Sequence, residues 1–330
     1  MKIRNILLAS AAMLFCTASA SATSTLSHTW VSGSGSDANP CTFASPCLTF
    51  SGALANTSAG GMITAKDAGD FGAVTIAQSV TIDGNNLGSI TYTGISGGNA
   101  ISITASVNVT VQNLTINGMG LAADGIDVEN GGTLIVDNCR IMNFTLYNIF
   151  FTGTGNLTVE DSRIESFIFS GSGSTRGIQI QGTAAENVVV RNTVIDASSV
   201  TASNYGIVVN TGTGPVKVSL QNVTIMGAGN AAVEAWSGVT EITGSVLTQS
   251  YYGVYAYMSA TISVASSMIT ANTTGVHSDT GSKVRLDNND IYDNTTAIDN
   301  GGGIVKTSGT NKTSGTIAIP AADISNSVTF

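Results

Sequence analysis

The stretches "VASSMI" (264–269) and "LDNNDI" (286–291) follow the same pattern and begin 22 residues apart (286 − 264). Each begins and ends with an apolar residue and carries a small or polar residue at its third position. Six further copies lie upstream: "VQNLTI" (111–116), "VDNCRI" (136–141), "VEDSRI" (159–164), "VRNTVI" (190–195), "LQNVTI" (220–225) and "ITGSVL" (242–247). Such self-similarity indicates a repeat architecture.

A second motif interleaves with the first at the same period. Its copies are "GIDV" (125–128), "NIFF" (148–151), "GIQI" (177–180), "GIVV" (206–209), "AVEA" (232–235), "GVYA" (253–256), "GVHS" (275–278) and "AIDN" (297–300). Each repeat therefore holds at least two short segments that are rich in Val, Ile and Thr and alternate with period two. Turns of Gly, Asn, Ser and Thr separate these segments, which indicates short strands.

The repeat contains no segment with helical spacing, which excludes leucine-rich and helical repeats. Short strands without crossover helices predict an all-β parallel β-helix, whose coils stack at the strand spacing of ~4.8 Å. A β-propeller is the alternative, but its blades need about 40 residues each. The third position of the first motif predicts a ladder of turn residues that hydrogen-bond between coils. This ladder runs Asn113, Asn138, Asp161, Asn192, Asn222, Gly244, Ser266, Asn288.

The first 22 residues have the pattern of an export signal that is cleaved. Lys2 and Arg4 precede a short apolar core, and Ala18-Ser19-Ala20 offers a cleavage site. Loss of these two cations changes the net charge from -9 to -11 (-9 - 2). No basic cluster remains, so nucleic acid is excluded as a partner, and no segment reaches membrane-spanning length. We expect a secreted protein in the periplasm, outside the cell or on its surface.

Residues 23–61 are expected to form a disulfide loop and a capping helix. Cys41 and Cys47 suit a disulfide in an oxidising compartment, with two free thiols as the alternative, and Cys139 suits a buried filler. Within 45–61, Ser45 is the expected N-cap, and the stretch ends in a Gly pair. This helix would cover the open end of a β-helix over 62–305, and 306–330 would form a C-terminal tail.

The order "CLTFSGALANTSAGG", "DAGDFGAVTI", "VTIDGNN" resembles the start of secreted right-handed β-helix proteins of the pectin-lyase-like superfamily. The repeats extend this resemblance over most of residues 40–305, and the resemblance implies the right-handed form. The superfamily includes lyases, hydrolases, epimerases, adhesins and binding proteins, so the fold does not fix the chemistry. The catalytic motifs of pectate lyases, polygalacturonases and alginate epimerases do not occur in this chain. The sequence indicates neither a cofactor nor a metal site.

In the second motif the apolar residues point inward, so the residue between them and the residue after the motif point outward. The first outward ladder is Asp127, Phe150, Gln179, Val208, Glu234, Tyr255, His277, Asp299. The second is Glu129, Thr152, Gln181, Asn210, Trp236, Tyr257, Asp279. Three neighbouring coils are therefore expected to expose Glu234, Trp236, Tyr255, Tyr257, His277 and Asp279 on one face.

Aromatic rings beside carboxylates suit sugar, because rings stack on C–H surfaces and carboxylates accept hydrogen bonds from hydroxyls. The sequence therefore favours binding of a polysaccharide or cell-surface glycan through Glu234, Trp236, Tyr255 and Tyr257. A lyase or hydrolase that uses Glu234, His277 or Asp279 is one alternative. A structural surface protein or adhesin is the other. Long loops at 167–176 and 197–205 are expected beside this face, while the polymer and the oligomeric state stay open.

Two further assignments follow from the pattern. Tyr252 precedes the Gly of the repeat, as Tyr147 and Tyr205 do, so it is predicted to belong to the scaffold. Asp137, Glu160 and Arg191 share one outward ladder, and Arg140 and Arg163 share another. These five residues are predicted to form ion pairs on a solvated face.

Overall fold

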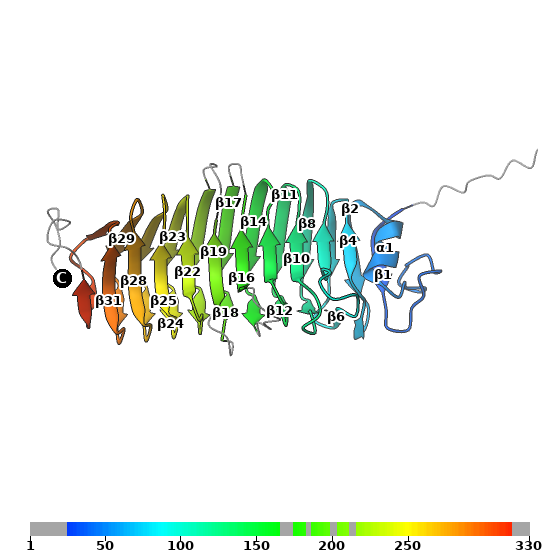
Figure 1. The fold of residues 1–330 in the computed structure, drawn as a ribbon. Helices are drawn as coiled ribbons and strands as arrows, with labels where there is room; N and C mark the ends of the chain where they lie inside the picture. The colour runs from blue at the N-terminus through cyan, green and yellow to red at the C-terminus, as the bar shows by residue number, and fades with distance from the viewer. Residues whose placement is uncertain (1–24, 166–173, 183–185, 199–202, 211–215, 319–330) are drawn as a thin grey trace, which may run out of the picture.

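The molecule is a parallel β-helix in which three long sheets run along one axis (Figure 1). This computed structural model describes residues 25–165, 174–182, 186–198, 203–210 and 216–318. Within those residues every pairing between named strands is parallel, and strands of successive coils lie side by side in each sheet.

Each sheet takes one strand from nearly every coil. Sheet A consists of β1 (Leu26–Val31), β2 (Thr57–Ala65), β5 (Val80–Asp83), β8 (Val107–Gln112), β11 (Gly132–Asp137), β14 (Gly155–Glu160), β17 (Glu186–Arg191), β20 (Val216–Gln221), β23 (Val239–Thr243), β26 (Thr261–Ala265), β29 (Lys283–Asp287) and β32 (Ile304–Thr307). Sheet B consists of β3 (Gly69–Asp70), β6 (Gly88–Thr91), β9 (Thr115–Asn117), β12 (Arg140–Met142), β15 (Arg163–Glu165), β18 (Val194–Asp196), β21 (Thr224–Met226), β24 (Val246–Thr248), β27 (Met268–Thr270), β30 (Asp290–Tyr292) and β33 (Lys312–Thr313). Sheet C consists of β4 (Val74–Ile76), β7 (Ile101–Ile103), β10 (Asp124–Val128), β13 (Tyr147–Phe151), β16 (Thr175–Ile180), β19 (Asn204–Val209), β22 (Ala231–Ala235), β25 (Tyr252–Ala256), β28 (Thr274–Asp279), β31 (Thr296–Gly301) and β34 (Thr316–Ala318).

The interior is filled by columns of identical or similar apolar side chains. In sheet B, one buried column runs Ile90, Ile116, Ile141, Ile164, Ile195, Ile225, Leu247, Ile269, Ile291. Alternation along each strand places these residues inside and their neighbours outside. Because every coil contributes a branched side chain at the same height, the core continues from coil to coil.

The predicted turn ladder lies between sheets A and B and is confirmed. All eight of its residues have positive φ angles, from 48° at Asn192 to 60° at Gly244, which Asn, Asp and Gly tolerate best. Asn222 Nδ2 donates to Asn192 Oδ1 at 2.9 Å, and Asn138 Nδ2 donates to Asn113 Oδ1 at 2.8 Å. Side-chain hydrogen bonds thus join several neighbouring coils along this ladder, whereas Gly244 has no side chain to contribute.

A second, inner ladder is not evident from the sequence pattern. Where the residue after the turn residue is Ser or Asn, its side chain points into the protein and accepts a backbone N–H of the preceding coil. Ser245 N donates to Ser267 Oγ at 3.1 Å, and Ser267 N donates to Asn289 Oδ1 at 3.0 Å. Asn289 N donates to Asn311 Oδ1 at 2.9 Å. These polar groups satisfy turn amides that the core would otherwise leave without partners.

The N-terminal end is covered by the helix α1 (Phe50–Asn56), which packs against sheet A (Figure 1). Phe50 is buried, and its ring centroid lies 5.1 Å from that of Phe71. The expected N-cap, Ser45, is wrong. The helix begins after Thr49, whose side chain accepts the Gly52 N–H, because Cys47 is held in extended backbone against Val31.

The remaining predictions about the cysteines and the two ends of the chain have mixed outcomes. Cys41 and Cys47 form the predicted disulfide, and Cys139 is buried as a free thiol. The helix ends at Asn56 rather than at the Gly pair, because residues 57–65 form β2. Strands also continue past residue 305, through β33 and β34 to Ala318. The predicted signal segment lies outside the described residues, and none of the described helices is long and apolar enough to cross a membrane.

Candidate functional site

The outer face of sheet C carries the candidate site residues in register. Strand pairing places the first predicted ladder in one row across neighbouring strands, and Ser102 of β7 extends the row by one coil. The row runs Asp127, Phe150, Gln179, Val208, Glu234, Tyr255, His277, Asp299. The predicted register of this face is therefore confirmed.

The second row lies just beyond the strand ends. Trp236 N donates to Val209 O and Tyr257 N donates to Ala235 O, both at 2.8 Å, so the backbone continues the ladder after β22 and β25. Asp279 is the last residue of β28. The structure thus brings together all six predicted site residues on three neighbouring coils.

Aromatic rings in this region form a continuous cluster. The ring centroids of Trp236 and Tyr257 are 5.5 Å apart, and those of Tyr257 and Tyr255 are 6.0 Å apart. Tyr252 extends the cluster, with its ring 4.8 Å from that of Tyr255 and 5.2 Å from that of His277. Tyr252, which was predicted to belong to the scaffold, thus also contacts the predicted site residues. Its side chain lies on the outer face, one position before the Gly of the repeat.

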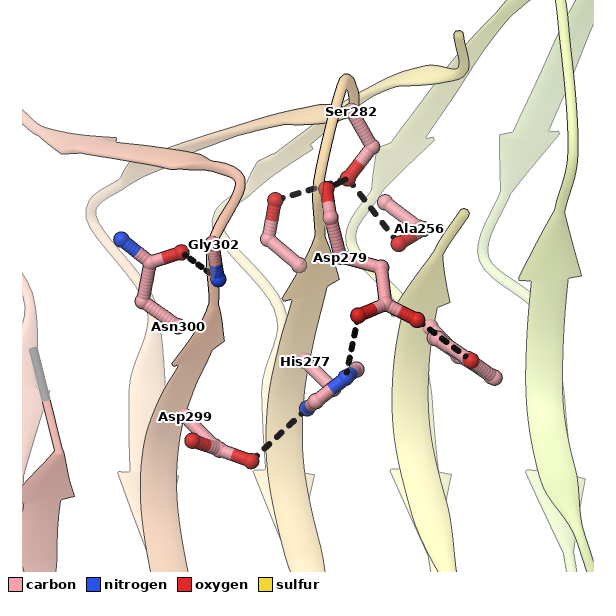
Figure 2. Close-up of polar contacts among 9 residues, drawn as sticks. Ala256, His277, Asp279, Ser282, Asp299, Asn300 and Gly302 are labelled. Atoms are coloured by element: carbon pink, nitrogen blue, oxygen red, sulfur yellow. Dashed lines mark hydrogen bonds and ion pairs between the residues drawn. The ribbon is translucent and has the colours of Figure 1, made fainter. Parts of the chain in front are cut away.

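His277 lies between two carboxylates (Figure 2). Its Nδ1 atom is 2.8 Å from Asp299 Oδ2, within hydrogen-bond distance, and its Nε2 atom is 3.7 Å from Asp279 Oδ1. Tyr255 donates its hydroxyl to Asp279 Oδ2 at 2.9 Å. Burial is the largest cause of the raised pKa of Tyr255, and this hydrogen bond is the next. The four side chains form one connected polar group across three coils.

Space beside the imidazole is kept open by Gly301, which pairs with Asp279 in sheet C. A Cβ atom at this position would lie 3.0 Å from His277 Nε2 and 2.8 Å from Asp279 Oδ1. Contacts this short do not occur between real side chains, so any larger residue would displace the imidazole or the carboxylate. The glycine thus leaves His277 Nε2 unobstructed on that side.

Glu234 and His277 were expected to be exposed, but they are only 5% and 9% exposed. Glu234 is covered because Trp236 lies over it and donates its indole N–H to Glu234 Oε1. Burial raises the pKa of Glu234, while the indole and the nearby Arg176 oppose that shift. His277 is covered by the rings of Tyr252 and Tyr255.

Arg176 is a residue of this face that the sequence analysis missed. Its guanidinium lies between two rings, 5.5 Å from the Tyr147 centroid and 5.3 Å from the Tyr205 centroid. It also donates to the Tyr147 hydroxyl at 3.1 Å. Strand register places the three side chains in one row, since each precedes the Gly or Asn of its repeat. That shared position is the signal that could have identified them.

The N-terminal end of the face is acidic. Burial raises the pKa of Asp124 to about 7, and the neighbouring Asp127 contributes to the shift. Burial also raises the pKa of Asp127, as does Glu129, while Asn99 donates to Asp127 Oδ2 at 2.8 Å. Asp127 belongs to the predicted ladder, but its burial could not be read from the sequence.

The predicted ion pairs lie on other faces. Arg191 pairs with Glu160 on sheet A, and both Arg140 and Arg163 pair with the buried Glu165 on sheet B. Of the five predicted residues, Arg191 and Glu160 pair with each other, Arg140 and Arg163 pair with the unpredicted Glu165, and Asp137 is in none of the ion pairs of the described residues, so the prediction is confirmed only in part. Most of the two long loops, 167–176 and 197–205, lies outside the described residues. The described residues hold no group of three side chains arranged to bind a metal ion.

Comparison with known proteins agrees with this architecture. The sequence profile of the family described as "Right handed beta helix region" matches residues 62–240 and 205–322, so the chain belongs to this family. The crystal structure of pectate lyase Pel9A has a similar fold, with a TM-score of 0.56 and 13% identity, over 92% of this chain and 84% of that chain. The A-module of mannuronan C-5 epimerase AlgE6 from Azotobacter vinelandii gives 0.48 and 12%, over 80% and 88%. No curated protein matches the sequence.

Proposed function

We propose that the protein binds a polysaccharide on the outer face of sheet C, in the region of Glu234, Trp236, Tyr255 and Tyr257. One observation carries this proposal: aromatic rings of neighbouring coils form a continuous cluster, in which Trp236 donates to Glu234 and Tyr255 donates to Asp279. Aromatic faces stack on the C–H surfaces of sugars, and carboxylates accept hydrogen bonds from their hydroxyls. The fold shared with a pectate lyase is consistent with a carbohydrate ligand.

The rigidity of the surface also supports binding. Tyr252 and Tyr255 stand on β25, which pairs with a strand on either side, and Tyr255 is further held by its hydrogen bond to Asp279. Side chains fixed in this way lose little conformational freedom when a ligand arrives. An extended polymer could follow the helix axis and meet an equivalent position at each coil, every ~4.8 Å.

Tyr257→Ala is the most direct test. The ring of Tyr257 contacts Trp236 and Tyr255 without holding a buried polar group. We expect this variant to lower retention on polysaccharide columns about tenfold or more, as for aromatic residues at binding hot spots, while thermal unfolding stays near wild type. Trp236→Ala is less suitable, because it would leave the buried Glu234 without its indole donor.

The matched control is Tyr292→Ala, which removes a partly buried tyrosine from the outer face of sheet B. The proposal requires that this variant keeps wild-type retention. If Tyr257→Ala and Tyr292→Ala are retained equally, the result would favour a structural surface protein or adhesin. The same conclusion would follow if the wild-type protein is retained by none of a broad panel of polymers.

Catalysis is a second candidate, favoured by the contact between His277 and Asp299. A carboxylate at Nδ1 orients an imidazole so that Nε2 can exchange a proton with a substrate. A lyase would yield unsaturated ends and a hydrolase new reducing ends, and His277→Gln or Glu234→Gln should abolish either product. A polysaccharide panel that yields neither product with the wild-type protein would exclude this candidate while leaving binding intact.

A further inference from the structure

The strands of sheet C have a one-sided distribution of charge. Their sequences include five carboxylates: Asp124, Asp127, Glu234, Asp279 and Asp299. Arg176 is the one Arg or Lys in these eleven strands, all of which are described. The whole chain is also acidic, with a net charge of -9. Asp124, Asp127 and Glu234 are buried, so Asp279 and Asp299 are the carboxylates of these strands that a ligand on this face meets.

The single arginine is already engaged by its neighbours. Tyr147 and Tyr205 lie on either side of the guanidinium, and the Nε atom is enclosed without a hydrogen-bond partner. Glu234 lies close enough for Arg176 to oppose the rise of its pKa. The guanidinium therefore does not form an open, bidentate site of the kind that binds carboxylates or sulfates.

The aromatic cluster and the carboxylates at its edge favour a cationic ligand. The side chains of Asp279 and Asp299 are 29% and 39% exposed, so their oxygens can reach a ligand. The Tyr255 hydroxyl donates to Asp279, and the rings of Tyr252 and Tyr255 contact the His277 ring that lies between the two carboxylates. Aromatic faces attract cations through their quadrupole. Rings and carboxylates at one place favour an ammonium group over an anion.

We propose that the ligand of this face is a polymer of amino sugars, whose rings carry ammonium groups and no carboxylate or sulfate. Asp279 and Asp299 accept the ammonium group, and the tyrosine and tryptophan rings stack on the sugar. This inference rests on the proposed glycan-binding function and specifies its ligand class. A polyuronate would instead place an anion at each coil beside a carboxylate, within one Debye length of about 8 Å at physiological salt.

The test compares three hexasaccharides by titration calorimetry at slightly acidic pH: β-1,4-linked glucosamine, β-1,4-linked N-acetylglucosamine and α-1,4-linked galacturonate. We expect glucosamine to bind about tenfold more tightly than its neutral N-acetyl analogue, and we expect added salt to remove most of that difference. We expect no measurable binding of galacturonate. Hexasaccharides are short enough to limit the non-specific attraction of a long polycation to an acidic protein, and their equal length makes the three affinities comparable.

Two isosteric variants test whether the preference for glucosamine arises from the carboxylates on the outer face of sheet C. Asp279→Asn and Asp299→Asn keep an acceptor for Tyr255 and His277, and each should lower the affinity for glucosamine about two- to fivefold. Glu241→Gln removes the same charge from the exposed outer face of sheet A and should change the affinity much less.

Three outcomes would overturn the inference. Galacturonate binding at least as tightly as glucosamine, with loss in Tyr257→Ala, would keep the glycan-binding function but reject the amino-sugar class. Equal effects of Asp279→Asn and Glu241→Gln would show that attraction is general to the acidic chain. If none of the three sugars binds and no polymer is retained, the glycan-binding function and the amino-sugar class fail together.

Discussion

Asn289→Ala is expected to destabilise the β-helix far more than a change at the adjacent Asn288. Asn289 is 1% exposed, and its Oδ1 atom accepts the Ser267 N–H at 3.0 Å. Its Nδ2 atom donates to Val264 O at 2.8 Å and to Asn311 Oδ1 at 2.9 Å. Alanine would leave Ser267 N–H and Val264 O without this partner, while Asn311 Oδ1 keeps the Asn289 backbone N–H. At about 1–3 kcal/mol for each of these two groups, the free energy of unfolding should fall by roughly 2–6 kcal/mol.

Two companion variants make this prediction specific. Asn288 is exposed with a φ of 51°, and Gly244 occupies the equivalent turn position, so Asn288→Gly should cost about 1 kcal/mol or less. Asn289→Ser restores an acceptor, as Ser267 does for the preceding coil, so its loss should be intermediate. The measurement is urea unfolding followed by circular dichroism. If Asn289→Ala and Asn288→Gly unfold at the same urea concentration, the reasoning about the inner ladder is refuted.

Three further predictions concern charge and close packing. The pKa of Asp124 is about 7 in the folded chain, above its ordinary value of 3.8, so the folded chain binds more protons than the unfolded chain between these two values and loses stability as the pH rises through them. In urea unfolding, Asp124→Asn should therefore match the stability of the wild type near about pH 4 and exceed it near about pH 8. A stability difference that is the same at both pH values would contradict this prediction. Glu165→Gln should lower the free energy of unfolding by about 1–2 kcal/mol, because it weakens the contacts of a buried carboxylate with Arg140, and no change in the unfolding midpoint would argue against that role. Gly301→Ala should weaken polysaccharide retention without unfolding the chain, since its Cβ would displace His277. Unchanged retention would show that the position of His277 does not affect binding.

The sequence predicts the fold and the register of sheet C because both depend on periodicity. Alternation fixes which side of a strand faces the core, and the repeat length fixes which residues meet, so Glu234, Tyr255 and His277 were placed correctly in one row. The inner ladder was missed because Ser245, Ser267 and Asn289 differ in type while sharing one hydrogen-bonding role. A repeat pattern built on residue identity does not detect such a role.

Burial on the outer face was the other quantity that periodicity could not supply. Outward direction was equated with exposure, but Trp236 covers Glu234 and two tyrosine rings cover His277. Whether a side chain covers its neighbour depends on rotamers and on contacts between coils. The placement of Arg176 between two tyrosine rings depends on the same contacts. These depend on three-dimensional packing and leave no periodic trace in the chain.

The short span of the ladder contacts has a consequence for how the chain reaches its structure during synthesis. The turn and inner ladders join residues only 22 to 31 positions apart, as in the pairs Ser267–Asn289 and Asp161–Asn192. The capping helix and first coils leave the ribosome before the rest, so each new coil finds a finished template as soon as it emerges. Loop closure then costs a similar, modest entropy at every step. Folding can therefore proceed in the order of translation, from the N-terminal cap toward β34.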